Sequence, residues 1–324
     1  MRRALMMAVV LCGAASVCRA EALSLENMRA KADNLDINLS QMKQLEVPAV
    51  AGAVALDGQE AVPGYGQLPH YLPSDPSYTT AEGVRVWRFY QMDGYKSAAE
   101  ASAVMNYWRQ ALVQSGVRVT TWTVSEVVGY YEYEISYAGD NYVEAYEPEN
   151  TWPSPEAAVT AMAAQAAAIK KSGLTVVKAL PARYQGQYTF LIYYLAAYDR
   201  DAANRLRVCR YSPEELLADE NAAGEVAARD QAAFEKAGLP VLDVSFLSGP
   251  NGAFYFIHFV GKDKYPGKTV QGDLKGEAAA KQALAEFLRA LEAERAVVLE
   301  SKIYRSGPWF EDWYAFEVRY LKLQ

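Results

Sequence analysis

The sequence contains little cysteine, and most of it lies near the N-terminus. Of three cysteines in 324 residues, Cys12 and Cys18 fall within the first twenty. If that stretch is removed, Cys209 stands alone and an intramolecular disulfide is excluded. Stability must then come from hydrophobic cores, which a chain of this length can bury. Two interpretations of Cys209 stay open: a buried strand residue, which we favour, and a reactive thiol.

The sequence also lacks a basic cluster. Its formal net charge is −7, and because the first twenty residues hold three arginines and no acidic residue, the remainder carries −10. An acidic chain without a basic patch argues against nucleic acid and anionic membranes as partners.

Motifs of known chemistry are missing as well. The chain has two histidines, no Gly-rich phosphate loop, no G-x-S-x-G, no H-E-x-x-H and no cysteine pair. We therefore predict no cofactor and no metal site, and we favour a protein without enzymatic activity over an enzyme.

The first twenty residues have the three parts of a signal peptide. Arg2 and Arg3 precede an apolar stretch that ends at Val17, and Cys18-Arg19-Ala20 forms a small-x-small cleavage site. We predict cleavage near Ala20 and a secreted or periplasmic protein of bacterial type. No later apolar run approaches the roughly 20 residues that a membrane helix needs, so we expect no transmembrane segment in the mature chain.

Two segments of different character follow the signal peptide. Residues 21–46 carry apolar residues at alternating spacings of three and four, which predicts an amphipathic helix. It either docks on the protein's own body, which we favour, or self-associates. Residues 47–83 are punctuated by Pro and Gly without lasting periodicity, which predicts a linker.

The rest of the chain repeats itself four times. We place the repeats at residues 84–141, 142–203, 204–266 and 267–324. In each repeat a helix ends, a strand starts at once and an aromatic strand follows, which indicates a β-α-β-β unit. The helices end at Gly116, Gly173, Gly238 and, without a glycine, Arg295. The aromatic strands are Tyr133–Tyr137, Phe190–Tyr194, Tyr255–Phe259 and Phe316–Tyr320.

Helix starts are marked by capping residues. Ser97 with Glu100 forms a capping box, and Ser154-Pro155 and Ser212-Pro213 predict the starts of the second and third helices. The third helix then contains eight extra residues, and we expect Gly224 to mark a break or a second short helix. The predicted fold class is α+β: tandem β-α-β-β repeats form antiparallel sheets with helices packed on one face. Pairing of the repeats into two lobes stays open.

The two faces of the aromatic strands differ between repeats. One face is aromatic or aliphatic in all four and should lie under the helix. The other is polar in the first and last repeats, which predicts contact with water, but apolar in the middle two. This face carries the candidate partner-binding residues Leu191, Tyr193, Phe254, Phe256 and His258. Two interpretations compete: packing within the protein, which we favour, and a surface that grips a partner.

A helix, then Gly-Val, then a Tyr-x-Tyr-x-Ile strand resembles the PepSY-type and SPOR-type modules of bacterial cell envelopes. The alternating pattern matches over about half of each repeat. Resemblance to SPOR modules implies binding of peptidoglycan glycan, and resemblance to PepSY modules implies a propeptide or inhibitory role. No residue roles are carried over.

From the sequence we expect a non-enzymatic binding or scaffolding protein of the bacterial envelope or periplasm, with an envelope protein or a glycan as partner. One alternative is a hydrolase of envelope polymers that uses paired carboxylates such as Glu132/Glu134 or Glu311/Asp312. Another is an exported enzyme inhibitor, for which the hairpin Trp309–Trp313 is the candidate loop. Oligomeric state is not predicted.

Overall fold

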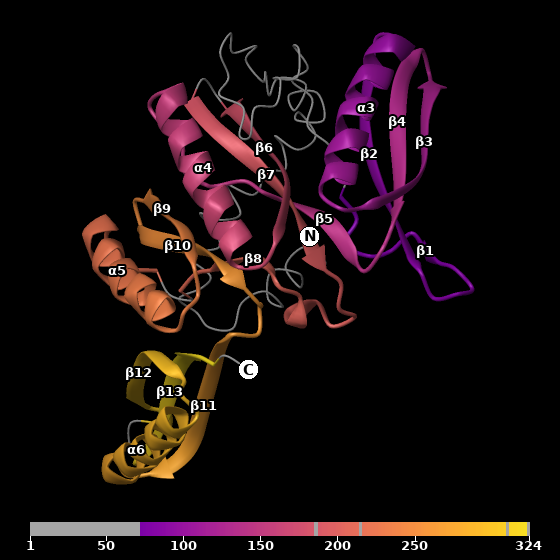
Figure 1. Cartoon of the computed structure of the whole chain (residues 1–324). Helices are drawn as coiled ribbons and strands as arrows, with labels where there is room; N and C mark the ends of the chain where they lie inside the picture. The colour runs from indigo at the N-terminus through magenta and orange to yellow at the C-terminus, as the bar shows by residue number, and fades with distance from the viewer. Residues whose placement is uncertain (1–71, 185–186, 214–215, 309–310, 323–324) are drawn as a thin grey trace, which may run out of the picture. The chain divides into compact units, whose positions relative to one another are not determined.

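The computed structural model describes residues 72–184, 187–213, 216–308 and 311–322. The predicted signal peptide, the predicted helix 21–46 and the linker up to residue 71 lie outside the described residues. The described residues form the helices α3, α4, α5 and α6, and each lies along one face of a small sheet (Figure 1).

Each of the four repeats has the element order strand, helix, strand, strand. The first consists of β2 (Arg85–Tyr95), α3 (Ala98–Gln114), β3 (Arg118–Val127) and β4 (Tyr130–Ala138), preceded by the short β1 (Tyr78–Thr79). The second consists of β5 (Asn141–Tyr146), α4 (Pro155–Lys171), β6 (Thr175–Tyr184) and β7 (Gln187–Ala197). After the 3₁₀ turn η3 (Ala202–Asn204), the third consists of β8 (Arg207–Tyr211), α5 (Glu220–Lys236), β9 (Val241–Gly249) and β10 (Gly252–Gly261). The fourth consists of β11 (Pro266–Lys275), α6 (Glu277–Ala293), β12 (Val297–Arg305) and β13 (Trp313–Leu321).

The last strand of every repeat lies in the middle of its sheet. The strand orders are β1-β2-β4-β3, β5-β7-β6, β8-β10-β9 and β11-β13-β12. β4, β7 and β13 run antiparallel to both of their neighbours, and β10 runs antiparallel to β9. The predicted α+β fold of tandem β-α-β-β repeats is therefore confirmed. The helix-facing residues of the aromatic strands are buried except for Tyr320, which is half-buried. Phe259 and Phe316 contact helix residues Phe234 and Phe287 directly.

The described chain divides into two compact units of two repeats each. Unit 1 runs to Arg200 and includes Arg205–Arg207, whereas unit 2 holds Asp201–Asn204 and the chain from Val208. Within unit 1, α3 contacts β6 of the following repeat, and within unit 2, α5 contacts β12 in the same way. In both units the first helix thus packs against its own sheet and against the next one.

Three of the helices begin at a side-chain cap. The hydroxyls of Ser97 and Ser154 accept the backbone N–H of Glu100 and Ala157, as the sequence predicts. The predicted start of the third helix at Ser212-Pro213 is wrong, because Asp219 caps α5 by accepting the N–H of Ala222 at 2.9 Å.

The expected break at Gly224 is also wrong. The extra residues lie mainly in the connection between β7 and β8, which has nine residues where the β4–β5 connection has two, and Gly224 sits inside an uninterrupted helix. All four helices have 17 residues, so the repeat keeps its helix length and varies its connections. A single interior glycine weakens a helix without ending it, because a helix that packs on a sheet does not depend on local propensity alone.

All four helices end in the same hydrogen-bond pattern. The residue after the left-handed position donates its N–H to a carbonyl five residues earlier, and this acceptor is a buried apolar residue in every repeat. The four bonds are Val117 to Leu112, Leu174 to Ile169, Leu239 to Phe234 and Ala296 to Leu291. The left-handed positions are glycines with φ of 87°, 90° and 76° in the first three repeats, and Arg295 with φ of 58° in the fourth.

A β-bulge recurs at one place in the strand that follows each helix. The ladder to the central strand skips Thr120, Val177, Leu242 and Leu299. Each lies four positions after the left-handed residue that ends the helix. The position of the bulge is therefore a feature of the repeat, although the residue type at that position changes. In the fourth repeat the extra residue, Leu299, is buried in the core of the third repeat with Phe234.

The outer face of the fourth repeat differs from the expectation that it faces water. Glu317 is buried on the central strand β13 and pairs with Lys268 at 3.4 Å and Lys302 at 3.7 Å, one from each neighbouring strand. The two ammonium groups compensate the carboxylate, which makes its burial tolerable.

Gly224→Ala should raise the free energy of unfolding by about 1 kcal/mol, because alanine is the better helix former by that amount. A Cβ at this position meets no atom within 4 Å. The matched control is Gly173→Ala, where a Cβ also meets no atom but φ is +90°. There we expect a loss of about 1 kcal/mol, since a side chain is disfavoured in the left-handed region. Urea unfolding measures the free energy of unfolding of both variants. If it changed in the same direction in both, the placement of Gly224 inside a helix and of Gly173 at a left-handed position would be contradicted.

Arg295→Gly should stabilise the protein by about 0.5–1 kcal/mol. Glycine removes the strain of a side chain at φ 58°, and this outweighs the greater freedom of glycine in the unfolded chain. The change is read as a rise in the urea midpoint at unchanged slope. A lower midpoint would contradict this, because it would mean that the Arg295 side chain stabilises the folded protein by more than the strain at its backbone destabilises it.

Candidate functional site

One predicted contact residue of the second repeat, Tyr193, lies under the helix of the first. Leu191 and Tyr193 on β7 are buried, and Tyr193 has no exposed surface. Its ring meets that of Trp108 on α3 edge to face, with centroids 4.7 Å apart. Burial raises the pKa of Tyr193 well above its usual value, so the hydroxyl stays protonated. In unit 1, therefore, the packing interpretation accounts for Tyr193.

The predicted residues of the third repeat are more accessible. Phe254 and Phe256 on β10 are half-buried, whereas His258 is buried on the same face. The guanidinium of Arg210 lies over the Phe256 ring, 4.8 Å from its centroid. A cation held against an aromatic face contributes about 0.5–1 kcal/mol where it is exposed. Phe254, Phe256 and Arg210 form what we call the aromatic patch of the third repeat.

His258 has an acidic neighbour that the sequence did not reveal. Asp243 on β9 stands directly opposite it in the ladder, with Nδ1 of the histidine 3.0 Å from the carboxylate. Ser245, two residues further along β9, is on the same face and buried, but its hydroxyl has no hydrogen-bond partner among the described residues. Serine, histidine and aspartate are the residue types of a catalytic nucleophile, base and acid. Catalysis requires a hydrogen bond between the nucleophile and the base, either in the free protein or once substrate is bound. The missing contact and the burial of all three side chains favour a packed polar cluster.

The carboxylate pairs considered for hydrolysis are engaged or peripheral. Glu134 lies 3.4 Å from Arg88 and accepts the Ser136 hydroxyl. Glu311 and Asp312 are exposed in the β12–β13 connection, where the Asp312 carbonyl accepts the N–H of Gly276. The hairpin Trp309–Trp313 contains two residues, 309 and 310, outside the described part of the chain, and Trp313 is half-buried.

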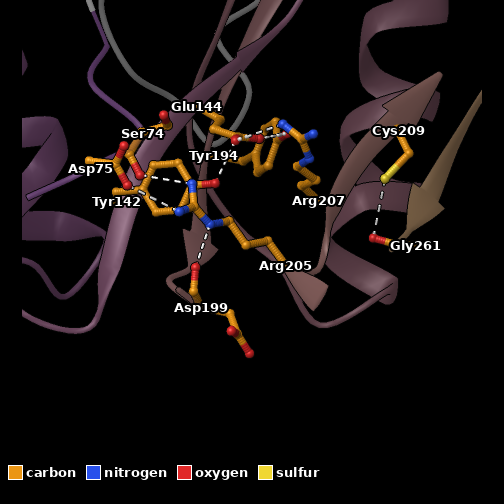
Figure 2. Close-up of polar contacts among 10 residues, drawn as sticks. All are labelled: Ser74, Asp75, Tyr142, Glu144, Tyr194, Asp199, Arg205, Arg207, Cys209 and Gly261. Carbon is orange, nitrogen blue, oxygen red and sulfur yellow. Dashed lines mark hydrogen bonds and ion pairs between the residues drawn. The ribbon is translucent and has the colours of Figure 1, made fainter. Parts of the chain in front are cut away.

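The densest polar cluster of unit 1 surrounds Glu144 on β5 (Figure 2). Tyr142 and Tyr194 each donate a hydroxyl to a different oxygen of this carboxylate at 2.6 Å, and Arg207 lies 3.5 Å away. Burial, and next the charge of Glu144, raises the pKa of Tyr142 above its usual range. The Tyr142 hydroxyl therefore remains a donor, and both oxygens of Glu144 are engaged in hydrogen bonds within the protein.

Arg205 ties distant segments of unit 1 together. Its guanidinium donates to the carbonyls of Asp199 at 2.7 Å and Ser74 at 2.8 Å, and to the carboxylate of Asp75 at 3.2 Å (Figure 2). It also lies over the ring of Tyr198, 4.6 Å from the centroid. A buried arginine with its donors engaged in this way fastens the chain before β1 to the segment after β7.

Unit 2 has its own buried carboxylate and its single thiol. Asp230 on α5 accepts the hydroxyls of Tyr211 and Tyr255 and pairs with Arg229 at 2.9 Å. Cys209 is buried, and its Sγ lies 3.5 Å from the Gly261 carbonyl (Figure 2). This matches the interpretation of Cys209 as a strand residue within the core.

Glu144→Gln should lower the free energy of unfolding by about 1–2 kcal/mol, because one tyrosine hydroxyl then faces an amide donor in place of a carboxylate oxygen. The matched control is Glu134→Gln. Its salt bridge joins two half-exposed side chains, for which we expect a change below about 0.5 kcal/mol. Chemical unfolding measures the free energy of unfolding of both variants. Equal decreases would contradict the conclusion that the hydrogen bonds of Glu144 contribute more to stability than those of Glu134.

The described residues contain no group of three or more side chains arranged to hold a metal ion, and none of their helices is both long and apolar enough to cross a membrane. Comparisons with protein-family models, curated proteins and solved structures give no match to this chain. The resemblance to PepSY-type and SPOR-type modules thus depends on the strand pattern alone.

Proposed function

We propose that this chain is an exported, non-enzymatic binding or scaffolding protein of the bacterial envelope or periplasm. The observation that carries the proposal is the aromatic patch of the third repeat, where Phe254 and Phe256 keep exposed surface on a sheet face. Aromatic side chains and arginine are the residues that most often dominate the energy of protein interfaces. Tandem repeats in addition present extended surfaces that suit scaffolding.

Export is supported by the N-terminal sequence, with its arginines, apolar stretch and cleavage site. The partner is an envelope protein or a glycan. Aromatic rings pack against both, and the strand pattern shared with SPOR-type modules is consistent with a glycan.

Two other functions receive less support. A hydrolase needs two carboxylates free to face a glycosidic bond, whereas Glu134 and Glu144 are engaged in hydrogen bonds within the protein. An enzyme inhibitor needs an exposed loop that fits an active site. Neither the hydrolase nor the inhibitor function gives a role to the aromatic patch of the third repeat.

The test compares the mature chain with Phe256→Ala. Binding to purified peptidoglycan is measured by co-sedimentation, and binding to envelope proteins by affinity capture from detergent extract. Loss of Phe256 should weaken binding about tenfold or more if this residue is a hot spot. Soluble fragments released from the peptidoglycan are measured in the same samples.

Phe246→Ala is the matched control, since Phe246 is 43 % exposed on the opposite face of the same sheet, across from Tyr255. It should bind like the unmodified chain. Binding lost equally in both variants, or absent in all, contradicts the proposal. Release of fragments by the unmodified chain supports the hydrolase instead.

A further inference from the structure

Strand β3 is an edge strand that carries few of the features that block further pairing. It ends the sheet β1-β2-β4-β3, so one side of its backbone has no strand neighbour within the described part of the chain. Its ten residues are exposed or half-buried and contain no proline. Its two charges, Arg118 and Glu126, stand at or next to the strand ends. An edge of this kind can accept another strand.

The other long edge strands interrupt their edges nearer the middle. β6 has Lys178 and Pro181, and β9 has Asp243. β11 has Lys268 and Asp273, and β12 has Glu300 and Lys302. Central charges and proline are the usual means by which sheet edges avoid pairing. Within the described chain, β3 is therefore the edge strand with the longest run free of charge and proline, residues 119–125.

The part of β3 beyond its bulge is regular. After Thr120 is skipped, residues 121–127 pair with β4 without interruption up to the turn at Val128-Gly129. Positive φ at both turn residues, 49° and 80°, identifies a type I′ hairpin. In such a hairpin Val127 and Tyr130 form a hydrogen-bonded pair, and the pattern alternates from there. Trp122, Val124 and Glu126 consequently direct their N–H and C=O groups away from β4.

This seven-residue stretch is self-complementary when two copies run antiparallel about Val124. Val124 then faces its own equivalent, and Trp122 faces Glu126 of the second copy. All three pairs consist of residues whose backbone groups point outward, so six new hydrogen bonds can form. A two-fold axis on Thr123 instead would place Glu126 opposite the bulged Thr120 of the other copy.

The charges fit the same register. Arg109 on α3 lies over the Trp122 ring, 4.4 Å from its centroid, on the helix-side face of the sheet. Its Nε is buried and has no hydrogen-bond partner among the described residues. Glu126 of the second copy would arrive opposite Trp122 on that same face, within reach of the guanidinium. By symmetry the pair forms twice.

We propose that two copies of this chain associate through β3, joining their first sheets into one continuous antiparallel sheet centred on Val124, with Arg109 of each copy facing Glu126 of the other. The contact is small compared with the interfaces of stable complexes, which bury about 1,200–2,000 Å². The dimer is therefore concentration-dependent. This association is independent of the proposed partner binding by the aromatic patch, which lies on another repeat.

Engineered cysteines test the register in the mature full-length chain. In the proposed dimer the Val124 Cα atoms lie about 5.5 Å apart, within disulfide range, whereas the Val127 Cα atoms lie about 20 Å apart. Val124→Cys should form covalent dimers under mild oxidation, and Val127→Cys on the same strand should not. The native Cys209 is buried, so the unmodified chain serves as the background. Equal cross-linking at both positions, or none at either, overturns the proposal.

Charge exchange provides a second test, read by sedimentation equilibrium. Glu126→Arg should weaken association at least fivefold, because each Arg109 then faces a like charge. Combining Arg109→Glu with Glu126→Arg should restore it. Far-ultraviolet circular dichroism checks that each variant is folded. Association that is unchanged by Glu126→Arg contradicts the pairing, and a monomer at every concentration contradicts the dimer.

Discussion

The structure depends on the fact that each small repeat has one helix but a sheet with two faces. The helix covers the face that carries the aromatic ladder of the central strand, and the opposite face needs another cover. Within unit 1, α3 supplies it for the second repeat through Trp108 and Tyr193. Within unit 2, α5 contacts β12, and Leu299 joins the core around Phe234. Repeats of this size cannot bury enough apolar surface alone, so stacking of neighbours is a condition of their stability.

Equivalent positions in the repeats have diverged according to what they contact. The eleventh residue of each helix is Trp108, Gln165, Asp230 or Phe287. Asp230 is accommodated by two tyrosine hydroxyls and Arg229. Trp108 instead reaches the next sheet, and Phe287 packs within its own repeat. The scaffold is thus constant, whereas polar clusters are specific to single repeats.

Function must therefore be sought in what differs between the repeats. The aromatic patch of the third repeat and the edge strand β3 of the first, whose charges stand only at or next to its ends, are both features of single repeats. They use different parts of the unit, a sheet face and a sheet edge, and lie in different units of the chain. Under the two proposals, binding through one and association through the other would use surface that the core leaves exposed or half-buried.

The sequence by itself determined the four repeats, the helix ends and the burial of the aromatic strands. These depend on local signals, namely a glycine in the left-handed region, a cap and alternation with period two, which act within a few residues. Local signals misplaced the third helix, because Ser212-Pro213 resembles a cap and the true cap, Asp219, carries no proline after it. The bulge at Thr120 and its equivalents also left no trace, since it follows from the register with a distant strand. Only the tertiary structure decided that Tyr193 is covered by Trp108, that His258 stands beside Asp243 and that Glu144 is held by two tyrosines. Those contacts join residues far apart in the chain, and their energy depends on which surfaces meet when the repeats pack.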